Sequence, residues 1–457
     1  MNRVTKRTWL MGLFLIVLLV GMVFFLWEYT AHAGDWVIFP GSPHVYNGTN
    51  IGCGTVVDRA GTVLLDITEN RTYAENETTR KSTLHWLGDR RGFISADAVS
   101  GYAAQMAGFD LIDGVYGASG TGGEARLTID ASIQNAALEA LAGRKGTVAV
   151  YNYKTGEILC AVTSPTYDPD NVPDIAADTT DHWEGVYLNR FVQSVYIPGS
   201  IFKIVTTSAA LECVPDILNR TFTCTGRLEY GTEAVTCAVP HGTLTLSTAL
   251  QNSCNCSFAQ IGQLVGRENM KKYVQQFGVT DSLTFDGVTT AKGNYDIAQT
   301  GAVSFAWSCI GQHTNQINPA RYMTFMGAIA AGGNGALPHL VSSVTVEGEQ
   351  TYTAETKMSG RLMSEETAAL VQEYLRSTVV NMYGTKHFPD MTVCGKSGTS
   401  QLGGDLTSNA MFAGFVTDEE YPLAFVCAVE NGGYGAATCI PILSSVLARC
   451  KAVLDAQ

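Results

Sequence analysis

Hydrophobic residues at the start of the chain form one uninterrupted run. Positions 9–27 hold 19 consecutive residues without a charged side chain, which is long enough to span the hydrocarbon core of a bilayer. Three basic residues precede the run within positions 1–8, and no Lys or Arg follows it until Arg59. This asymmetry predicts a cytoplasmic tail at 1–8, a transmembrane anchor at 9–27 and an extracytoplasmic location for the rest of the chain. A signal peptide cleaved after Ala31-His32-Ala33 is the alternative.

After this run, the apolar segments become short and interrupted. Positions 54–57 and 62–65 predict strands, and positions 96–106 predict a helix. The stretch at 116–125 contains four glycines, which is typical of a flexible linker. We therefore predict a small, non-catalytic extracytoplasmic domain at 28–125.

A longer pattern follows the linker and predicts a second domain at 126–457. Asp130 is a suitable N-cap for a helix whose apolar positions recur through residue 141. Strands are predicted at 146–153, 157–163, 393–400, 410–416 and 423–430, and helices from Ser200 and at 246–265, 319–331 and 442–454. Because strands flank a mostly helical middle, we expect an α+β fold in which helices flank a central antiparallel sheet.

Composition narrows the class of protein. The chain has 457 residues, of which 46% are hydrophobic and 16% are charged, so it can bury a sizeable core and is not a disordered chain. Its formal net charge of -13 argues against nucleic acid as a partner, because phosphate binding needs clustered Lys and Arg.

The first candidate for chemistry is Ser200. It follows a Pro-Gly turn and precedes an apolar, helix-forming run, so it should stand at a helix N-terminus with Lys203 one turn later on the same face. A serine hydroxyl becomes a good nucleophile when a neighbouring base takes its proton, and a desolvated lysine can be that base. The alternative is an ordinary N-cap serine followed by a surface lysine.

Two further motifs favour catalysis. Ser253-Cys254-Asn255 is the only Ser-x-Asn in the chain, and Lys396-Ser397-Gly398-Thr399 lies on a predicted strand. Together with Ser200-x-x-Lys203, and in this order, they resemble the motifs of penicillin-binding proteins and class A β-lactamases. Lys154-Thr155-Gly156 also matches the last motif, but it lies upstream of Ser200 and is interpreted as turn chemistry.

The resemblance implies a role for each motif residue. Ser200 would be the nucleophile, Lys203 its base and Ser253 the proton relay to the leaving amine. Backbone N–H groups of Ser200 and Thr399 would form the oxyanion hole. The residues implied in catalysis are Ser200, Lys203, Ser253 and Lys396, and those implied in substrate binding are Asn255, Ser397, Gly398 and Thr399. The resemblance implies no metal and no organic cofactor.

The resemblance extends over nearly all of residues 30–457. Stretches at 146–168, 241–242, 310–312 and 412–415 look like a penicillin-binding transpeptidase domain, and the stretch at 54–61 resembles the signature that opens the pedestal of class B members. The chain departs from the usual class B pattern at two places. Cys53 stands where Arg is usual, and Asn318-Pro319 replaces the usual Thr-Pro. The roughly 100 residues before Leu127 leave little room for a glycosyltransferase domain, so we expect a protein with the transpeptidase activity alone.

The implied activity is that of a membrane-anchored D,D-transpeptidase. It would bind peptidoglycan stem peptides ending in D-Ala-D-Ala, cross-link them through an acyl-enzyme on Ser200 and be inhibited by β-lactams. A membrane glycosyltransferase of the shape, elongation, division and sporulation class is the implied partner. A D,D-carboxypeptidase or β-lactamase is the enzymatic alternative, although no Glu-x-x-x-Asn stands between Asn255 and Lys396. A scaffold or β-lactam sensor is the non-enzymatic one.

The chain contains twelve cysteines. Cys224 and Cys237 flank a short hairpin-like segment, so an oxidising exterior predicts a disulfide between them. The same two residues and His241 could form part of a zinc site. No fourth ligand stands at a convincing spacing, so the sequence prediction is that there is no metal.

Overall fold

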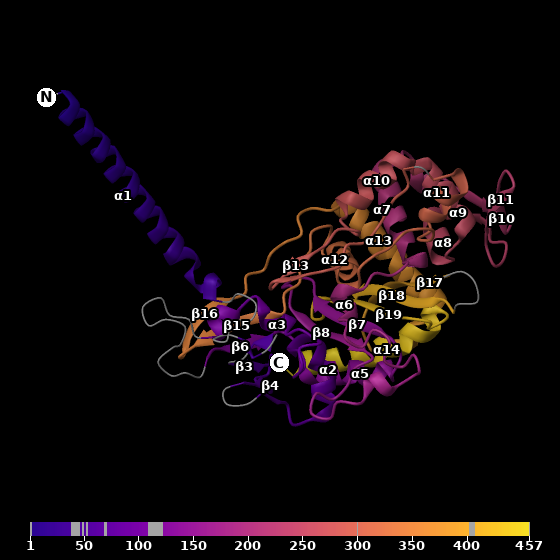
Figure 1. Ribbon diagram of the computed structural model, residues 1–457. Coiled ribbons are helices and arrows are strands. Elements are labelled where there is room, and N and C mark those ends of the chain that lie inside the picture. Colours follow the sequence, from indigo (N-terminus) through magenta and orange to yellow (C-terminus); the bar gives the residue numbers. More distant parts are fainter. Residues whose placement is uncertain are drawn as a thin grey trace.

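The computed structural model describes residues 2–37, 46–47, 50–51, 54–67, 71–107, 122–298, 300–401 and 407–456. Cys53 and most of the predicted linker at 116–125 lie outside these residues. The described chain forms a long N-terminal helix, a small sheet beside the inner end of that helix, and a large body of helices around a second sheet (Figure 1).

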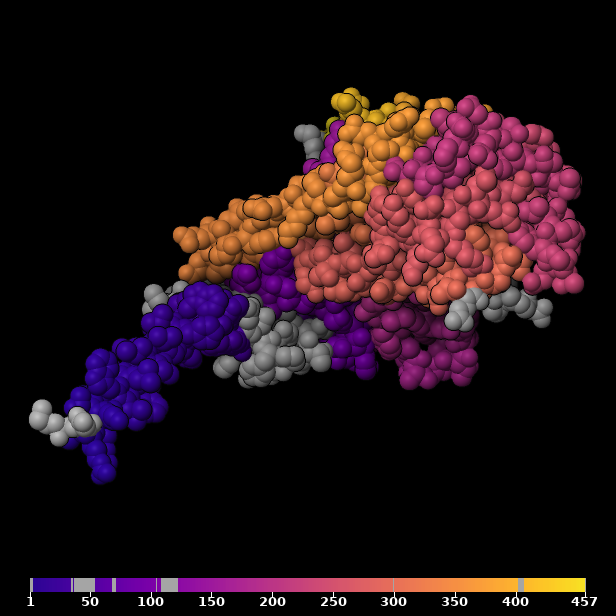
Figure 2. All heavy atoms as spheres, turned by 90° about the horizontal axis from the view of Figure 1, so that it is seen from above, coloured from indigo at the N-terminus to yellow at the C-terminus, as the bar shows by residue number. Residues whose placement is uncertain are grey.

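The N-terminal apolar run forms helix α1 (Asn2–Val37). Its apolar side chains are exposed, and the helix points away from the body in the ribbon and space-filling views (Figures 1 and 2). An exposed apolar helix of this length is what a membrane anchor requires. Helix α14 (Gly435–Asp455) is also long and apolar enough to span a membrane, but much of it is buried against the body.

The small sheet has six strands in the order β16-β15-β6-β3-β4-β5, and only β3 and β6 pair in parallel. Its strands are β3 (Thr55–Val57), β4 (Val63–Asp66), β5 (Thr72–Tyr73), β6 (Glu124–Leu127), β15 (Val341–Val346) and β16 (Glu349–Thr353). Strands β15 and β16 come from far along the chain and lie near the inner end of α1, where that helix meets the body (Figures 1 and 2). Residues on both sides of position 125 thus share one sheet.

Helix α2 (Glu77–Leu87) joins this end of the molecule to the body. Arg80 forms two hydrogen bonds of 2.7 Å with the carboxylate of Asp168, and the Trp86 indole donates to Ala161 O at 2.7 Å. The helix predicted at 96–106 is interrupted, and two short helices stand there, α3 (Asp97–Ser100) and α4 (Ala103–Met106).

The central sheet of the body is antiparallel, in the order β17-β18-β19-β7-β8. Its strands are β7 (Gly146–Asn152), β8 (Ile158–Ser164), β17 (Val393–Ser400), β18 (Asn409–Val416) and β19 (Leu423–Val429). Helices α5 (Ala131–Leu141) and α14 pack together and cover one face, while α12 (Pro319–Ala330) and α13 (Glu365–Thr378) pack on the other. The predicted α+β fold with a helix-flanked antiparallel sheet is confirmed.

The rest of the body is mostly helical, and most of it lies above the central sheet in Figure 1. Its helices are α6 (Arg190–Gln193), α7 (Lys203–Cys213), α8 (Leu246–Gln251), α9 (Asn255–Val265), α10 (Arg267–Gln276) and α11 (Ala302–Ser308). This part also contains three short antiparallel strand pairs. They are β9 (Phe222–Cys224) with β12 (Gly242–Leu244), β10 (Arg227–Tyr230) with β11 (Glu233–Thr236), and β13 (Thr284–Phe285) with β14 (Val288–Thr289). A last pair near the N-terminus joins β1 (Tyr46–Asn47) to β2 (Asn50–Ile51).

One predicted helix differs in a way that matters for the site. The run at 246–265 is two helices, α8 and α9, separated by Asn252, Ser253 and Cys254. Ser253 has φ 53°, a left-handed conformation that a regular helix cannot contain. The break presents the Ser-x-Asn motif at the N-terminus of α9.

Candidate active site

Ser200 lies in a tight 3-10 turn, Gly199–Phe202, that leads directly into α7. Gly199 has φ 55°, and a Cβ there would lie 2.6 Å from Thr399 O, so the turn packs against β17 only because this residue is glycine. Gly199 N donates to Gly311 O at 2.9 Å. The backbone around Ser200 is therefore fixed between β17 and the loop that contains Gly311.

Lys203 is the first residue of α7, and its side chain is fully buried. Its Nζ lies 3.0 Å from Ser200 Oγ and 3.1 Å from Ser253 Oγ, and donates to Ser253 O at 2.7 Å and to Asn255 Oδ1 at 2.8 Å. None of the ion pairs formed by the described residues includes Lys203. The amine thus joins two of the three motifs through hydrogen bonds to neutral groups.

Burial sets the charge of this amine. Desolvation lowers the pKa of Lys203 well below its usual range, and the positive charge of nearby Lys396 lowers it further. An amine whose pKa is lowered in this way loses its proton more readily and can then accept one from a hydroxyl.

The break between α8 and α9 brings the second motif to Ser200. Ser253 N donates to Leu250 O at 3.1 Å, while Ser253 O turns inward to accept from Lys203. The Asn255 amide Nδ2 donates to Thr236 O at 2.9 Å, which leaves Oδ1 facing the lysine. Asn255 therefore connects Lys203 to strand β11.

The third motif runs along β17, beside the turn that carries Ser200. A Cβ on Gly398 would lie 2.6 Å from Pro198 O, so the strand and the turn touch through a residue without a side chain. Lys396 is buried and donates to Ser397 O at 3.1 Å. Ser397 Oγ lies 2.9 Å from Tyr383 Oη, and Gly435 N donates to Thr399 Oγ1 at 3.1 Å.

A cavity of about 630 Å³ opens at these residues. Ser200, Asn255 and Thr399 all line it. The other lining residues are Thr236, Cys237, Ala238, Trp307, Ile310, Gln312, Gln401, Thr407, Ser408, Gly433 and Tyr434. Among these described residues there is no Asp or Glu, so the cavity offers hydroxyl, amide and aromatic groups but no carboxylate.

The structure thus brings Ser200, Lys203, Ser253 and Asn255 into one hydrogen-bonded group, with the four residues of the third motif on the adjacent strand. Lys154 lies elsewhere, in the exposed turn between β7 and β8, where its backbone N donates to Asn152 Oδ1 at 2.8 Å. Tyr383 was not found from the sequence. It lies at the end of an irregular helical turn, Val379–Tyr383, and no motif marks it.

The cysteine predictions need correction. Cys224 and Cys237 are both free, so the predicted disulfide between them is wrong. Cys224 lies beside His241, and Cys237 lies beside Cys254. The prediction that no fourth ligand is available is also wrong, because Cys254 completes a group of four with Cys224, Cys237 and His241.

Comparison with known families gives one match that covers most of the chain. A family model described as "Penicillin binding protein transpeptidase domain" matches residues 146–448. That range contains all three motifs, all five strands of the central sheet and the cavity.

Curated relatives and solved structures agree with this match. Stage V sporulation protein D of Bacillus subtilis is 26% identical over 82% of this chain and 58% of its own length. Peptidoglycan D,D-transpeptidase PbpA of Mycolicibacterium smegmatis is 27% identical over 74% of this chain and 73% of its own length. The D,D-transpeptidase domain of a peptidoglycan glycosyltransferase from Eggerthella lenta superposes with a TM-score of 0.76 at 26% identity, over 89% of this chain and 99% of that one. Penicillin-binding protein A of M. tuberculosis, as a ceftriaxone acyl-enzyme, has the same fold, with a TM-score of 0.74 at 23% identity over 87% of this chain and 97% of that one.

Proposed function

The chain belongs to the penicillin-binding protein transpeptidase family, and on this premise we propose that it is a serine D,D-transpeptidase that cross-links peptidoglycan stem peptides. The observation that carries the proposal is the fully buried amine of Lys203, held 3.0 Å from Ser200 Oγ and 3.1 Å from Ser253 Oγ beside a polar cavity. Two of the curated relatives that are similar to this chain are named peptidoglycan D,D-transpeptidases.

The hydrogen bonds of Lys203 support its role as the base. A neutral amine has two N–H donors and one lone pair. Ser253 O and Asn255 Oδ1 can only accept, and they are the two atoms nearest to Nζ, so they take both N–H groups. The lone pair is left for a hydroxyl hydrogen, and Ser200 Oγ is the nearest hydroxyl oxygen. The amine can therefore take the proton of Ser200 as its oxygen attacks.

The reaction has two acyl transfers. Ser200 Oγ attacks the carbonyl carbon of the penultimate D-Ala, and its proton passes to Lys203. Backbone N–H groups of Ser200 and Thr399 stabilise the oxyanion. The peptide C–N bond then breaks, and Ser253 passes its proton to the departing amine of the terminal D-Ala and takes the proton that Lys203 holds. An amine of a second stem peptide attacks the ester, which forms the cross-link and returns the hydroxyl to Ser200.

Residues of the third motif would hold the substrate. Lys396 offers a positive charge, and Ser397 and Thr399 offer hydroxyl groups, for the carboxylate of the terminal D-Ala. Their anchoring to Tyr383 and to the start of α14 supports a pre-formed site. Asn255 would bind the amide of the acyl chain, and its link to Thr236 supports that position.

A β-lactam should acylate the same serine and remain attached. The M. tuberculosis relative is described as an acyl-enzyme with ceftriaxone. No Glu-x-x-x-Asn stands between Asn255 and Lys396, which supports slow hydrolysis because class A β-lactamases use the Glu of that pattern to activate water for deacylation. This feature favours the transpeptidase over the β-lactamase alternative.

The proposal includes the arrangement of the chain at the membrane. The tail at 1–8 would be cytoplasmic, 9–27 would span the membrane, 28–125 would form the pedestal and 126–457 the catalytic domain outside. A membrane glycosyltransferase would supply glycan strands with uncross-linked stems. Protease added to wall-stripped cells should degrade the chain beyond residue 27, and its survival would contradict the orientation.

A transpeptidation assay tests the activity. The full chain, purified in detergent, is given a synthetic stem peptide ending in D-Ala-D-Ala and an acceptor amine. We expect D-Ala release together with a product that has the joined mass of donor and acceptor. Ser200→Ala should give neither, whereas Lys154→Ala, in the exposed turn, should give both. Release of D-Ala with only hydrolysed donor would show a carboxypeptidase and contradict the proposal.

A further inference from the structure

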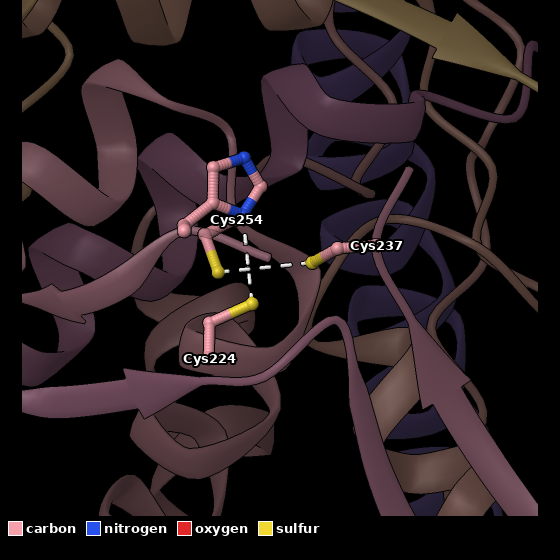
Figure 3. Close-up of side chains that lie close together, drawn as sticks. Cys224, Cys237 and Cys254 are labelled. Carbon is pink, nitrogen blue, oxygen red and sulfur yellow. Dashed lines mark hydrogen bonds between the residues drawn. The ribbon is translucent and has the colours of Figure 1, made fainter. Parts of the chain in front are cut away.

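Three thiols and one imidazole converge beside the Ser-x-Asn motif. Cys224 ends β9, Cys237 follows β11, His241 precedes β12 and Cys254 caps the N-terminus of α9. Figure 3 shows the sulfur atoms of Cys224, Cys237 and Cys254 pointing toward one another. The four potential ligand atoms all lie within 4.8 Å of one another.

Their spacing fits a tetrahedral zinc ion. Zn–S bonds of about 2.3 Å and Zn–N bonds of about 2.0–2.1 Å give tetrahedral edges of about 3.8 Å between two sulfurs and about 3.5 Å between sulfur and nitrogen. Cys237 Sγ and Cys254 Sγ are 3.7 Å apart, and Cys224 Sγ and His241 Nδ1 are 3.5 Å apart. The two distances involve four different atoms, so they correspond to two opposite edges of one tetrahedron of ligand atoms.

The same distances do not fit a disulfide. A disulfide needs two sulfurs about 2.0 Å apart and leaves no reason for a third thiol and an imidazole to face the pair. Cys224 and Cys254 are almost completely buried, and Cys237 is partly buried. A closed site with four protein ligands is typical of structural zinc and leaves no open position for catalysis.

Hydrogen bonds around the sulfurs support metal-bound thiolates. Cys254 Sγ accepts from Ser257 N at 3.4 Å and from Ser257 Oγ at 3.1 Å, and Cys237 Sγ accepts from Cys256 N at 3.4 Å. Donors of this kind orient metal ligands and offset the charge on their sulfur atoms.

We propose that Cys224, Cys237, His241 and Cys254 bind one structural zinc ion. Thiolate and imidazole ligands in a tetrahedral arrangement select zinc over magnesium or calcium, which prefer oxygen. The imidazole binds through Nδ1, the nitrogen that faces Cys224. This assignment needs no part of the proposed transpeptidase activity.

The site has a consequence for catalysis, and that consequence does rest on the proposed function. Cys254 is the middle residue of Ser253-Cys254-Asn255, so zinc would tie the motif to β9 and to the β10–β11 hairpin. Ser253, which is in the left-handed conformation, and Asn255 are the residues that hold Lys203. Zinc would therefore act as a positioning element for the proposed base.

Metal analysis of the full chain tests the site directly. The chain is purified in detergent with a reductant that is not a thiol, loaded with zinc chloride and desalted. Elemental analysis should give one zinc per chain. X-ray absorption should show three sulfur neighbours at about 2.3 Å and one nitrogen at about 2.0–2.1 Å. Loading with cobalt chloride instead should give the visible absorption of tetrahedral cobalt thiolate, displaced by zinc.

Variants identify the ligands, with a matched control beside them. Cys224→Ser, His241→Ala and Cys254→Ala should each reduce bound zinc to a trace. Cys256→Ala should retain it, although Cys256 Sγ lies 3.6 Å from Cys237 Sγ, because Cys256 is not one of the four. Loss of zinc in Cys256→Ala would overturn this ligand set. Zinc-free wild-type protein after loading, or a linked Cys224–Cys237 peptide from native membranes, would overturn the site altogether.

The two claims can fail separately. Removal of zinc by a chelator should slow the acylation rate constant for a β-lactam more than it weakens the initial complex, and zinc should restore the rate. Zinc binding with unchanged acylation would overturn the positioning role and leave the site standing. Normal acylation in protein that never binds zinc would overturn the site and leave the proposed function intact.

Discussion

Acidification should loosen the contact between α2 and the segment around Val186, because a buried neutral histidine holds them together. His85 is almost completely buried, and its Nε2 donates to Val186 O at 2.7 Å. Asn189 Nδ2 donates to His85 O at 3.2 Å from the same segment. Burial lowers the pKa of His85 to about 4, and the charge of Arg190 acts in the same direction.

The sign of the effect follows from proton linkage. A histidine in the unfolded chain has a pKa of about 6.5, so on acidification the unfolded state binds this proton before the folded state does. The contribution of His85 to the free energy of unfolding therefore falls as pH drops from about 6.5 to about 4. With these two pKa values the loss is about 2 kcal/mol at pH ~5 and about 3 kcal/mol once both states are protonated.

Denaturant unfolding of the full chain at pH ~7.5 and pH ~5 measures the loss, and Trp86 next to His85 gives a fluorescence signal. His85→Gln keeps an N–H for Val186 and cannot titrate, so its loss on acidification should be smaller than that of the wild type by about 2 kcal/mol. His182→Gln, at an exposed histidine, is the control and should behave like the wild type. Equal losses in wild type and His85→Gln would refute the reasoning.

Two substitutions at the site give further predictions. Lys203→Met keeps a buried chain of similar length without the amine, so labelling by a fluorescent penicillin should slow by about 10² to 10⁴-fold in folded protein; an unchanged rate would exclude the lysine as the base. Gly398→Ala places a Cβ 2.6 Å from Pro198 O and should force β17 from the Ser200 turn, lowering both acylation rate and melting temperature. Gly301→Ala, where nothing lies within 4 Å of the added Cβ, should leave the acylation rate unchanged and lower the melting temperature less, because only the N-cap of α11 is weakened; equal effects at the two glycines would contradict the packing argument.

Elements with strong local signals were predictable from the sequence. The strand predicted at 393–400 is β17 (Val393–Ser400), because turn-forming residues stand on both sides of the run, Pro389-Asp390 before it and Gly403-Gly404 after it. Asp130 caps α5 as predicted, with its carboxylate accepting from Ser132 N at 2.9 Å and Ile133 N at 3.2 Å. Such features depend on neighbours within a few residues, and a sequence pattern reports on those neighbours.

Features that depend on distant contacts were not predictable. The helix predicted at 246–265 breaks at Ser253. The carbonyl oxygen of Ser253 accepts a hydrogen bond from Lys203 Nζ, which is 50 residues earlier in the chain. Strand β6 pairs with β15 from more than 200 residues away, so a boundary drawn at 125 could not reveal their shared sheet.

The metal ligands were missed for a related reason. Cys254 is 17 residues from Cys237 and stands inside a motif that was interpreted for its serine and asparagine. The spacing of the four ligands has no regular period, because they come from the ends of three strands and one helix. Only folding brings their ligand atoms together.

Intact mass spectrometry of the chain treated with a β-lactam tests the central claim most directly. We predict one covalently added β-lactam per chain, mapped to the peptide that contains Ser200 and persisting for many minutes after free drug is removed. Ser200→Ala should show no adduct while keeping the melting temperature of the wild type, which would show that its fold is intact. An adduct that remains in Ser200→Ala, or one released as fast as it forms, would contradict an acyl-enzyme on Ser200.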